Sequence, residues 1–378
     1  MQFDSGAIQT ALDKYSRVEL TRTPTPLDYL PTLSQQLDIN LYLKRDDLTD
    51  LAFGGDKPRK LEYELVQAVE LKADTLVTCG SMQSNHARLT TAAARKLGMD
   101  CVVVLSHDQY EQIQGNLLTV YLMGARVEVI RDVDHWDLEK YGHAICDDLR
   151  ASGKTPYYVP VSGSTPRSSL GYVRGALELL AQLPEQGREL DAVYTPFGTG
   201  GTFTAMMLTF RQLGIECPFF GISVNRKEPT CHENLNHWWT ELCKLLSLDP
   251  ARSKGSYELH DEFIGPDYGY PTEAGLDAIM RMASTEGILL DPVYSGKVFS
   301  GLLAHVNEGR WPSDSTILML HSGGTPALFA YHEVIETHLR KRGIRGEDVR
   351  GVVQPDKPLQ TKLDAREAYT DALMEKYT

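Results

Sequence analysis

The chain has no long apolar run and no targeting segment at its start. Its first six residues, Met1 to Gly6, are neither basic nor apolar, so they do not form a secretory signal. No uninterrupted apolar run approaches the ~20 residues that a membrane-spanning helix needs. We therefore expect a cytoplasmic protein without a membrane partner.

Cysteine is scarce, and its spacing supports no metal site. The 378 residues include six cysteines, and no two of them form a Cys-x-x-Cys motif. Several lie in apolar, strand-like runs, so we expect reduced core cysteines and no bound metal. The six are Cys79, Cys101, Cys146, Cys217, Cys231 and Cys243.

Positive charge is in deficit. The chain has 38 lysines and arginines against 51 aspartates and glutamates, a formal charge of −13. This balance argues against a nucleic-acid partner, although it does not exclude a small anionic substrate, which senses only the local field. Hydrophobic residues make up 42% and charged residues 24%, as in ordinary globular proteins, and the length predicts two domains.

Short β-rich runs alternate with helical patterns over most of the chain. This rhythm predicts parallel sheets covered by helices on both faces. We expect strands at 41–44, 75–78, 101–105, 126–130, 157–160, 192–195, 218–224 and 316–320. We expect helices at 58–72, 85–97, 113–123, 137–151, 168–183, 201–213, 272–286, 297–308, 326–340 and 363–374, and a polar helix plus irregular chain over 227–262.

Lys57 follows a glycine turn, Gly54-Gly55-Asp56, at the start of an expected helix. A lysine forms an imine with a carbonyl when its amine is partly deprotonated and held in place, and a desolvated pocket does both. The alternative is a surface lysine at a basic helix start. Asp56 weakens the first interpretation, because a nearby carboxylate favours the charged amine.

The run Ser84-Asn85-His86 lies between an expected strand and an expected helix. In open α/β sheets, ligands bind beyond the carboxyl ends of the strands. A hydroxyl there can transfer a proton, and an amide can contact the oxygens of a cofactor. An ordinary helix cap is the alternative.

Glycine and hydroxyl residues follow the strand expected at 192–195. Glycines let the backbone close on a phosphate, while hydroxyls and helix N-terminal amides hold its charge. The run is Gly198-Thr199-Gly200-Gly201-Thr202. It is neither Gly-x-Gly-x-x-Gly nor a Gly-Lys-Ser/Thr loop, so a nucleotide is a weaker possibility, and a tight turn is the plain alternative.

Two tyrosines and a serine complete the candidates. Tyr268 and Tyr294 stand in loops before helices, where a phenol can act as an acid–base group or as a hydrogen-bond donor. Ser322, in His321-Ser322-Gly323-Gly324, can face a ring nitrogen. Core or loop tyrosines and a helix cap are the alternatives. Each signal is weak alone, and their joint occurrence is much stronger.

Together these runs resemble the D-cysteine desulfhydrase / 1-aminocyclopropane-1-carboxylate deaminase family of pyridoxal phosphate enzymes, fold type II. The resemblance extends from about residue 20 to residue 331. The runs that carry it are Leu43-Lys44-Arg45-Asp46-Asp47, Gly54-Gly55-Asp56-Lys57, Arg59-Lys60-Leu61-Glu62, Gln83-Ser84-Asn85-His86, Tyr294-Ser295-Gly296-Lys297 and His321-Ser322-Gly323-Gly324.

The resemblance implies a role for each candidate. Lys57 matches the imine lysine, and Ser84, near the substrate carboxylate, matches the serine of proton transfer. Tyr268 and Tyr294 match the two active-site tyrosines. Cofactor contacts are implied for Lys57, Lys60, Asn85, Gly198, Thr199, Gly200, Gly201, Thr202 and Ser322, and substrate contacts for Ser84, Asn85, His86 and Tyr294.

Two positions depart from the family pattern. Asp56 stands where asparagine usually precedes the lysine, and Ser295 stands where the deaminase branch has a glutamate. A carboxylate at the second position keeps the pyridine nitrogen protonated and makes a strong electron sink. Opening a cyclopropane ring needs that sink more than expulsion of sulfur does. Ser295 therefore favours elimination over deamination of the cyclopropane substrate.

The expected fold is two open, twisted, mostly parallel sheets flanked by helices, similar to the β subunit of tryptophan synthase. We expect a large cofactor domain from 1–65 plus 171–378, a small inserted α/β domain at 66–170, and a C-terminal extension at 343–378. The family resemblance also implies a homodimer.

The expected reaction is α,β-elimination from a small β-substituted amino acid, with D-cysteine giving pyruvate, hydrogen sulfide and ammonia. Alternatives are the cyclopropane deaminase and elimination from L-cysteine, cysteate, chloroalanine or serine. A pseudoenzyme that binds pyridoxal phosphate or an amino acid is the alternative outside enzymes.

Overall fold

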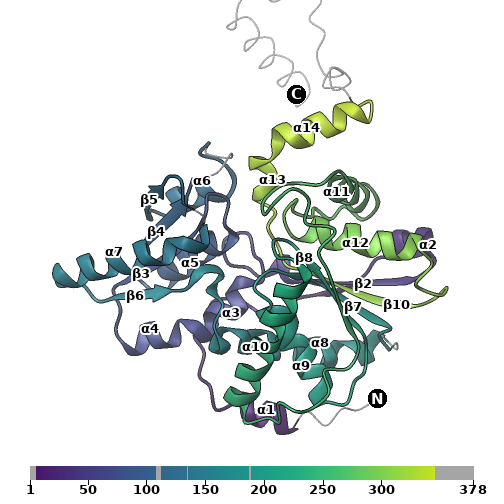
Figure 1. The fold of residues 1–378 in the computed structure, drawn as a ribbon, viewed down its shortest axis with the longest axis horizontal. Coiled ribbons are helices and arrows are strands. Elements are labelled where there is room, and N and C mark those ends of the chain that lie inside the picture. Colours follow the sequence, from purple (N-terminus) through teal and green to yellow (C-terminus); the bar gives the residue numbers. More distant parts are fainter. Residues whose placement is uncertain (1–5, 108–111, 134, 187–188, 345–378) are drawn as a thin grey trace, which may run out of the picture. The chain divides into compact units, whose positions relative to one another are not determined.

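The computed structural model describes residues 6–107, 112–133, 135–186 and 189–344 (Figure 1). The strands of this part form a six-stranded sheet, in the order β1-β2-β10-β7-β8-β9, and a four-stranded sheet, in the order β5-β4-β3-β6. All neighbours pair in parallel except β1 with β2. The strands are β1 (Leu27–Tyr29), β2 (Asn40–Arg45), β3 (Thr75–Ser81), β4 (Asp100–Ser106), β5 (Arg126–Ile130), β6 (Pro156–Val159), β7 (Ala192–Phe197), β8 (Phe219–Ser223), β9 (Tyr257–His260) and β10 (Thr316–His321).

Helices connect the strands and cover the sheets. They are α1 (Gly6–Leu12), α2 (Pro31–Leu37), α3 (Lys57–Glu64), α4 (Val66–Glu70), α5 (Asn85–Lys96), α6 (Gly115–Leu122), α7 (Glu139–Ala151), α8 (Pro166–Gln186), α9 (Gly201–Gln212), α10 (Glu228–Leu246), α11 (Glu273–Glu286), α12 (Ser295–Asn307), α13 (Ala327–Ala330) and α14 (His332–Lys341). No helix among the described residues is both long enough and apolar enough to cross a bilayer.

The four-stranded sheet is apolar on both faces. On one face Leu76 of β3 packs in the same cluster as Leu89 of α5, and on the other Val77 packs with Cys146 of α7. Leu76 and Val77 are successive residues, so their side chains point to opposite faces of the sheet. Both are apolar because helices cover both faces. The predicted fold class, two mostly parallel sheets flanked by helices, is confirmed.

Several element boundaries differ from the prediction. The helix expected at 58–72 is divided into α3 and α4, and the helix expected at 326–340 into α13 and α14. Strand β9 lies in the stretch expected to be irregular after a polar helix. It has only four residues, too few for the alternation of apolar and polar side chains in its sequence to identify a strand. The helix expected at 363–374 lies outside the described residues.

Packing divides the chain into two compact units, Met1–Tyr331 and His332–Thr378. Both sheets belong to the first unit. The domain boundaries expected after residues 65 and 170 stay a prediction, as does the extension at 343–378, most of which lies outside the described residues.

A buried charge network fixes α3 against β2 and α8. The guanidinium of Arg59 donates to both carboxylate oxygens of Asp46, at 2.9 Å each, and to both of Glu178, at 2.8 and 2.9 Å. Lys44 donates to Glu178 at 2.6 Å, and the Tyr172 hydroxyl donates to Asp46 at 2.7 Å. Burial alone raises the pKa of Asp46, but Arg59, Lys44 and Tyr172 together outweigh it and leave that pKa below its ordinary value.

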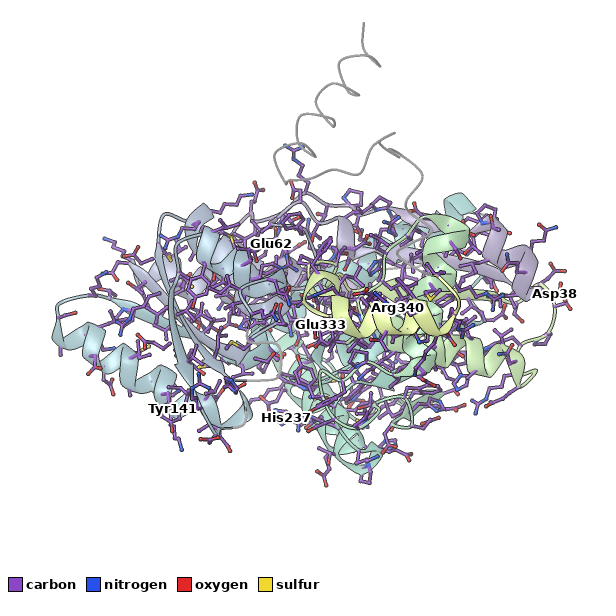
Figure 2. All side chains as sticks on the ribbon, turned by 90° about the horizontal axis from the view of Figure 1, so that it is seen from above. Asp38, Glu62, Tyr141, His237, Glu333 and Arg340 are labelled. Atoms are coloured by element: carbon purple, nitrogen blue, oxygen red, sulfur yellow. The ribbon has the colours of Figure 1, made fainter. Side chains whose placement is uncertain are left out.

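Glu62, one helical turn further along α3, holds the segment that precedes β1 (labelled in Figure 2). Its carboxylate accepts hydrogen bonds from the backbone amides of Leu20 and Thr21, at 3.0 and 3.2 Å, and from Arg17 at 2.7 Å. Helix α3 is therefore tied down on two sides, and its first residue, Lys57, has a fixed position.

Replacing Arg59 by methionine should leave the buried carboxylate of Asp46 without its ion-pair partner and that of Glu178 with Lys44 alone. We expect Arg59→Met to lower the free energy of unfolding by about 3–5 kcal/mol. Denaturant unfolding of the full chain measures the change. The control is Arg22→Gln, which removes the ion pair of an almost fully exposed arginine with Asp50 and should change the value by less than about 1 kcal/mol. Equal effects of the two substitutions would contradict this account.

The same network makes the stability of the fold depend on pH in the acid range. Because the folded-state pKa of Asp46 is below its ordinary value, its contribution is present near neutral pH and is lost as the pH falls through that folded pKa.

Candidate active site

Strand ends from both sheets meet at one cleft with about 820 Å³ of empty space, open to solvent. Gly80 and Ser81 come from the end of β3, and Pro196 from β7. Ser322 follows β10, and Asn225 follows β8. These are carboxyl ends of parallel strands, where ligands bind in α/β proteins.

Two glycine turns pack against each other and place Lys57 at the cleft. Gly54 has a φ of +66°, and a Cβ there would lie 2.0 Å from the carbonyl oxygen of Asp47. Gly323 has a φ of +90°, and its Cβ would lie 2.5 Å from the Cα of Gly55. The amide of Asp56 donates to the carbonyl of Ser322 at 3.0 Å. Only glycine permits this backbone approach, which joins the start of α3 to the end of β10.

Lys57 lines the cleft and pairs with its neighbour in the chain. Its Nζ lies 2.7 and 2.9 Å from the two carboxylate oxygens of Asp56. Both side chains are mostly buried. The departure from the family pattern at Asp56 therefore places a carboxylate in direct contact with the lysine amine.

Lys60, one turn along α3, lies at the glycine-rich loop. A Cβ on Gly201 would be 4.0 Å from its Nζ, and the Nζ donates to the hydroxyl of Ser164 at 2.6 Å. Burial, and next the charge of Lys57, lower the pKa of Lys60 to about 7. A buried amine of this kind is poised to gain a proton when an anion arrives.

Hydrogen bonds hold the glycine-rich loop in a conformation that can bind an anion. It leads into α9, whose first residue is Gly201, and Gly200 is in the left-handed conformation, with a φ of +95°. The hydroxyls of Thr199 and Ser164 lie 2.7 Å apart, and the indole of Trp238 donates to the Thr199 carbonyl at 2.6 Å. Helix N-terminal amides, hydroxyls and an amine suit a phosphate.

The prediction from sequence missed one side of this cradle. Ser162 and Ser164 line the cleft from the turn after β6, and Ser162 has a φ of +64°, which is unusual for serine. The run Val161-Ser162-Gly163-Ser164 follows a strand and carries hydroxyls around a glycine. It has the features that identified the other loops, so the same criterion would have found it.

The Ser84-Asn85-His86 run lies at the cleft in three different roles. Ser84 caps α5 by accepting from the amide of Ala87 at 3.1 Å, so the cap and the cleft residue are the same serine. Asn85 accepts from the side chain of Asn116 at 2.8 Å.

His86 is enclosed. Its ring nitrogens face the hydroxyls of Thr78, at 2.7 Å, and Thr90, at 3.3 Å. Burial, and next Lys57, hold the pKa of His86 well below its ordinary value. With both nitrogens occupied, the ring is better placed to support the site than to hold substrate, and its substrate contact stays a prediction.

The two tyrosines form a pair. The hydroxyls of Tyr268 and Tyr294 are 2.7 Å apart, and both side chains line the cleft. Burial, and next Tyr268, raise the pKa of Tyr294 well above its ordinary value. Tyr294 therefore keeps its proton at neutral pH and can donate it.

Ser295 does not line the cleft. It is fully buried, and its hydroxyl donates to the Asp291 carboxylate at 2.6 Å and accepts from the Asp291 amide at 2.8 Å. Asp291 also accepts from the amide of Tyr294 at 2.9 Å. Ser295 thus helps to fix Tyr294. Ser322 faces the cleft, as expected for a hydroxyl near a ring nitrogen.

The structure brings the predicted residues together. Among the described residues, Asp56 is the one carboxylate at the cleft, and Gly201 is the one predicted residue that does not line it. Those that do are Lys57, Lys60, Ser84, Asn85, His86, Gly198, Thr199, Gly200, Thr202, Tyr268, Tyr294 and Ser322.

Comparison with known families identifies the cofactor. Residues 18–323 match the family described as "Pyridoxal-phosphate dependent enzyme", a range that contains the whole cleft. The chain belongs to this family. The predicted cofactor, pyridoxal phosphate, is confirmed, and its chemistry fits the donor set: a lysine for its carbonyl, a cradle for its phosphate and a hydroxyl for its ring nitrogen.

Two curated relatives of this pyridoxal-phosphate dependent enzyme match over almost their entire length. D-cysteine desulfhydrase of Serratia proteamaculans (strain 568) is 39% identical over 330 residues, 86% of this chain and 98% of the relative. D-cysteine desulfhydrase of Salmonella newport (strain SL254) is 37% identical over 326 residues, 85% of this chain and 98% of the relative. The resemblance inferred from the motif runs is confirmed.

Solved structures agree. A crystal structure described as an "ACC deaminase homologue" is 34% identical, with a TM-score of 0.80, and the match covers 88% of this chain and 99% of that one. A fungal L-serine ammonia-lyase from Rhizomucor miehei is 18% identical, with a TM-score of 0.60 over 84% of this chain and 98% of its own, and shares the fold.

The phosphate cradle can be tested through Lys60. Lys60→Gln should raise the dissociation constant for pyridoxal phosphate by about 10- to 100-fold, because a hydrogen bond from a charged donor contributes about 1.5–3 kcal/mol. Equilibrium dialysis of the reconstituted protein measures it. Lys154→Gln, which changes a partly exposed lysine paired with Asp100, is the control and should bind like the parent. Unchanged cofactor affinity in Lys60→Gln would remove Lys60 from the cradle.

Proposed function

We propose that this pyridoxal-phosphate dependent enzyme is a lyase that catalyses α,β-elimination from a small β-substituted amino acid, with D-cysteine as the preferred substrate. The products are pyruvate, hydrogen sulfide and ammonia. The observation that carries the proposal is that one cleft holds a lysine amine and a hydrogen-bonded pair of phenols, of which Tyr294 keeps its proton because its pKa is raised. The desulfhydrase relatives support the choice of substrate.

The cofactor is held by the residues of the cradle and by Lys57. Lys60, the hydroxyls of Thr199 and Thr202 and the α9 amides bind its phosphate, while Asn85 and Ser322 contact its ring. When bound, it supplies a carbonyl for an amine and a ring that delocalises the electrons of the α-carbon. Side chains of the protein carry out the proton transfers and orient the substrate.

The lysine amine takes the α-proton of the substrate. Asp56, 2.7 Å from Nζ, stabilises the ammonium that this transfer creates. Ser84 lies at the same cleft, with its oxygen already accepting one hydrogen bond, so it can orient the substrate carboxylate by donating its proton.

A phenol then protonates the departing sulfur. The Cβ–S bond breaks, the sulfur leaves as hydrogen sulfide, and the electrons left on the α-carbon form the Cα–Cβ double bond. The released enamine takes up one water molecule and gives pyruvate and ammonia. Ser295 has a hydroxyl where the deaminase branch has a carboxylate, and this hydroxyl is buried against Asp291, so the position offers no carboxylate to the ring nitrogen. That favours elimination of a ready leaving group over opening of a cyclopropane ring.

Lys57→Ala should lower the rate of pyruvate formation from D-cysteine by at least ~10², the contribution of a general base. Lys60, the other amine at the cleft, is held at the phosphate cradle by Ser164 and is not expected to replace it. Purified protein is assayed with D-cysteine, L-cysteine and the cyclopropane amino acid, reading pyruvate and 2-oxobutyrate. Lys154→Ala is the matched control. Full turnover by Lys57→Ala would exclude the proposed mechanism, and 2-oxobutyrate as the main product would reassign the substrate. Bound cofactor without any product would favour a pseudoenzyme.

Substrates with different leaving groups test whether a tyrosine acts as the proton donor. Tyr268→Phe and Tyr294→Phe should lower kcat for D-cysteine, by about 10²–10⁴ for the phenol that protonates sulfur. With β-chloro-D-alanine the loss should shrink, because chloride leaves without a proton. Tyr270→Phe, which changes a partly exposed tyrosine in the same loop, is the control. Equal losses with both substrates would exclude acid catalysis by the pair.

The cytoplasmic location and the homodimer implied by the family resemblance stay predictions. Sedimentation or light scattering of the purified chain tests the second.

A further inference from the structure

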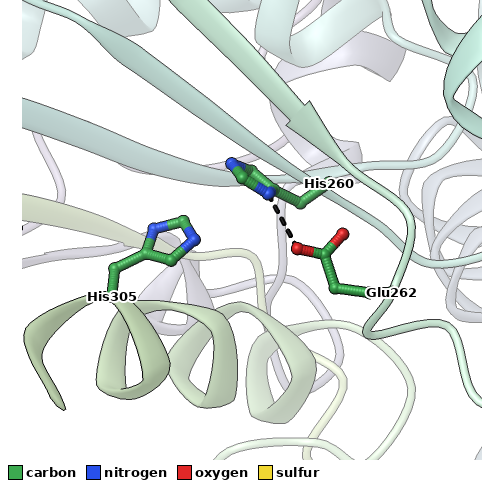
Figure 3. Close-up of side chains that lie close together, drawn as sticks. All are labelled: His260, Glu262 and His305. Carbon is green, nitrogen blue, oxygen red and sulfur yellow. Dashed lines mark hydrogen bonds and ion pairs between the residues drawn. The ribbon is translucent and has the colours of Figure 1, made fainter. Parts of the chain in front are cut away.

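Two histidines and a glutamate converge away from the cleft (Figure 3). His260 is the last residue of β9, Glu262 follows it, and His305 lies on α12. One possible ligand atom from each lies within 4.8 Å of the other two, and within the described residues this is the one group of three such side chains. None of the three lines the cleft.

The two imidazoles are arranged as metal ligands are, with one nitrogen of each held from outside. His305 Nδ1 lies 2.7 Å from the Tyr194 hydroxyl, and its other nitrogen lies on the side of His260 in Figure 3. His260 Nδ1 faces Glu262 at 2.9 Å, and His260 Nε2 lies 3.1 Å from Glu258. Outer oxygens of this kind orient ligating imidazoles and fix their tautomers.

The buried Nε2 atom of His260 makes no hydrogen bond. The ring is about nine-tenths buried, yet Nε2 contacts Glu258 only as an ion pair. A cation on Nδ1 moves the ring proton to Nε2, where Glu258, also paired with Arg310 at 2.7 Å, can accept it.

We propose that His260, Glu262 and His305 form a binding site for a divalent transition-metal ion, with zinc as the best fit. Two imidazoles and one carboxylate are a known zinc donor set, and bonds of about 2.0–2.2 Å place ligand atoms about 3.3 Å apart in a tetrahedron. Shifts of about 1 Å in the side chains reach that spacing. Glu262 is more than half exposed, so the ion has an entry path and water can complete its coordination.

The site would join the two segments that carry the tyrosine pair. The chain runs from Glu262 to Tyr268, and α12 begins directly after Tyr294. These segments already meet where Lys297 donates to the carbonyl of Ile264 at 2.6 Å. A metal bridge between β9 and α12 is a second tie between them, so its effect is on stability rather than on the chemical step.

Zinc binding to the cofactor-loaded enzyme tests the proposal. Isothermal titration calorimetry in buffer without thiols, and without the thiol substrate, should show about one equivalent of zinc. Glu262→Gln and His260→Gln should each weaken binding by at least ~10-fold, because each removes one ligand. Zinc should also raise the melting temperature of the parent and not that of Glu262→Gln.

Two matched variants separate this site from surface binding. Glu308→Gln changes a glutamate as exposed as Glu262, 58% against 57% of the side chain, and His232→Gln removes a helical His–Glu pair. Both should bind zinc like the parent. No saturable binding, or equal affinity in Glu262→Gln and Glu308→Gln, would overturn the proposal and leave His260 as an ion-pair partner of Glu258 and Glu262. Since Glu262 is exposed, its variant should fold even if that of His260 does not.

Discussion

The hydrogen-bonded ion pairs of Arg59 with Asp46 and Glu178 are the constraint on which the site depends. They join α3 to α8 and to the residue directly after β2 inside the core, and α3 begins with Lys57. A buried charge is tolerated only when its partners satisfy it, so the helix has few other positions open to it. The position of Lys57 is therefore set by the packing of α3 against the core, and the cleft that Lys57 lines stays free for a ligand.

The chemistry of the cleft arises from the meeting of the two sheets. Lysine and tyrosine groups come from segments attached to the six-stranded sheet, while Ser84 and Asn85 come from the end of β3 in the other. Neither sheet alone carries a complete site. The close approach of Gly55 and Gly323 shows how tightly the backbone is arranged where Lys57 enters.

Sequence analysis predicted the repeating architecture and the cleft because both rest on local patterns. Lys57, Ser84 and Ser322 each stand at a turn beside a helix or strand, and strand ends of a parallel sheet converge. What it missed are contacts that no motif contains, whether the partners are near or far apart in the chain. The partnership of Ser295 with Asp291 was not visible in a motif that compares Ser295 only with glutamate. His260 and His305 are 45 positions apart, so metal-ligand spacing gave no signal and no metal was expected.

The low pKa of Lys60 has a consequence for how the enzyme acquires its cofactor. Near and above pH 7, part of the cofactor-free population carries a neutral amine in the cradle. A phosphate dianion placed beside it favours the ammonium form, so loading draws a proton from solution. Cofactor capture is then a proton-coupled equilibrium, with heats that depend on the ionisation enthalpy of the buffer. Cofactor affinity should therefore fall as the pH rises through the range in which Lys60 of the cofactor-free enzyme loses its proton.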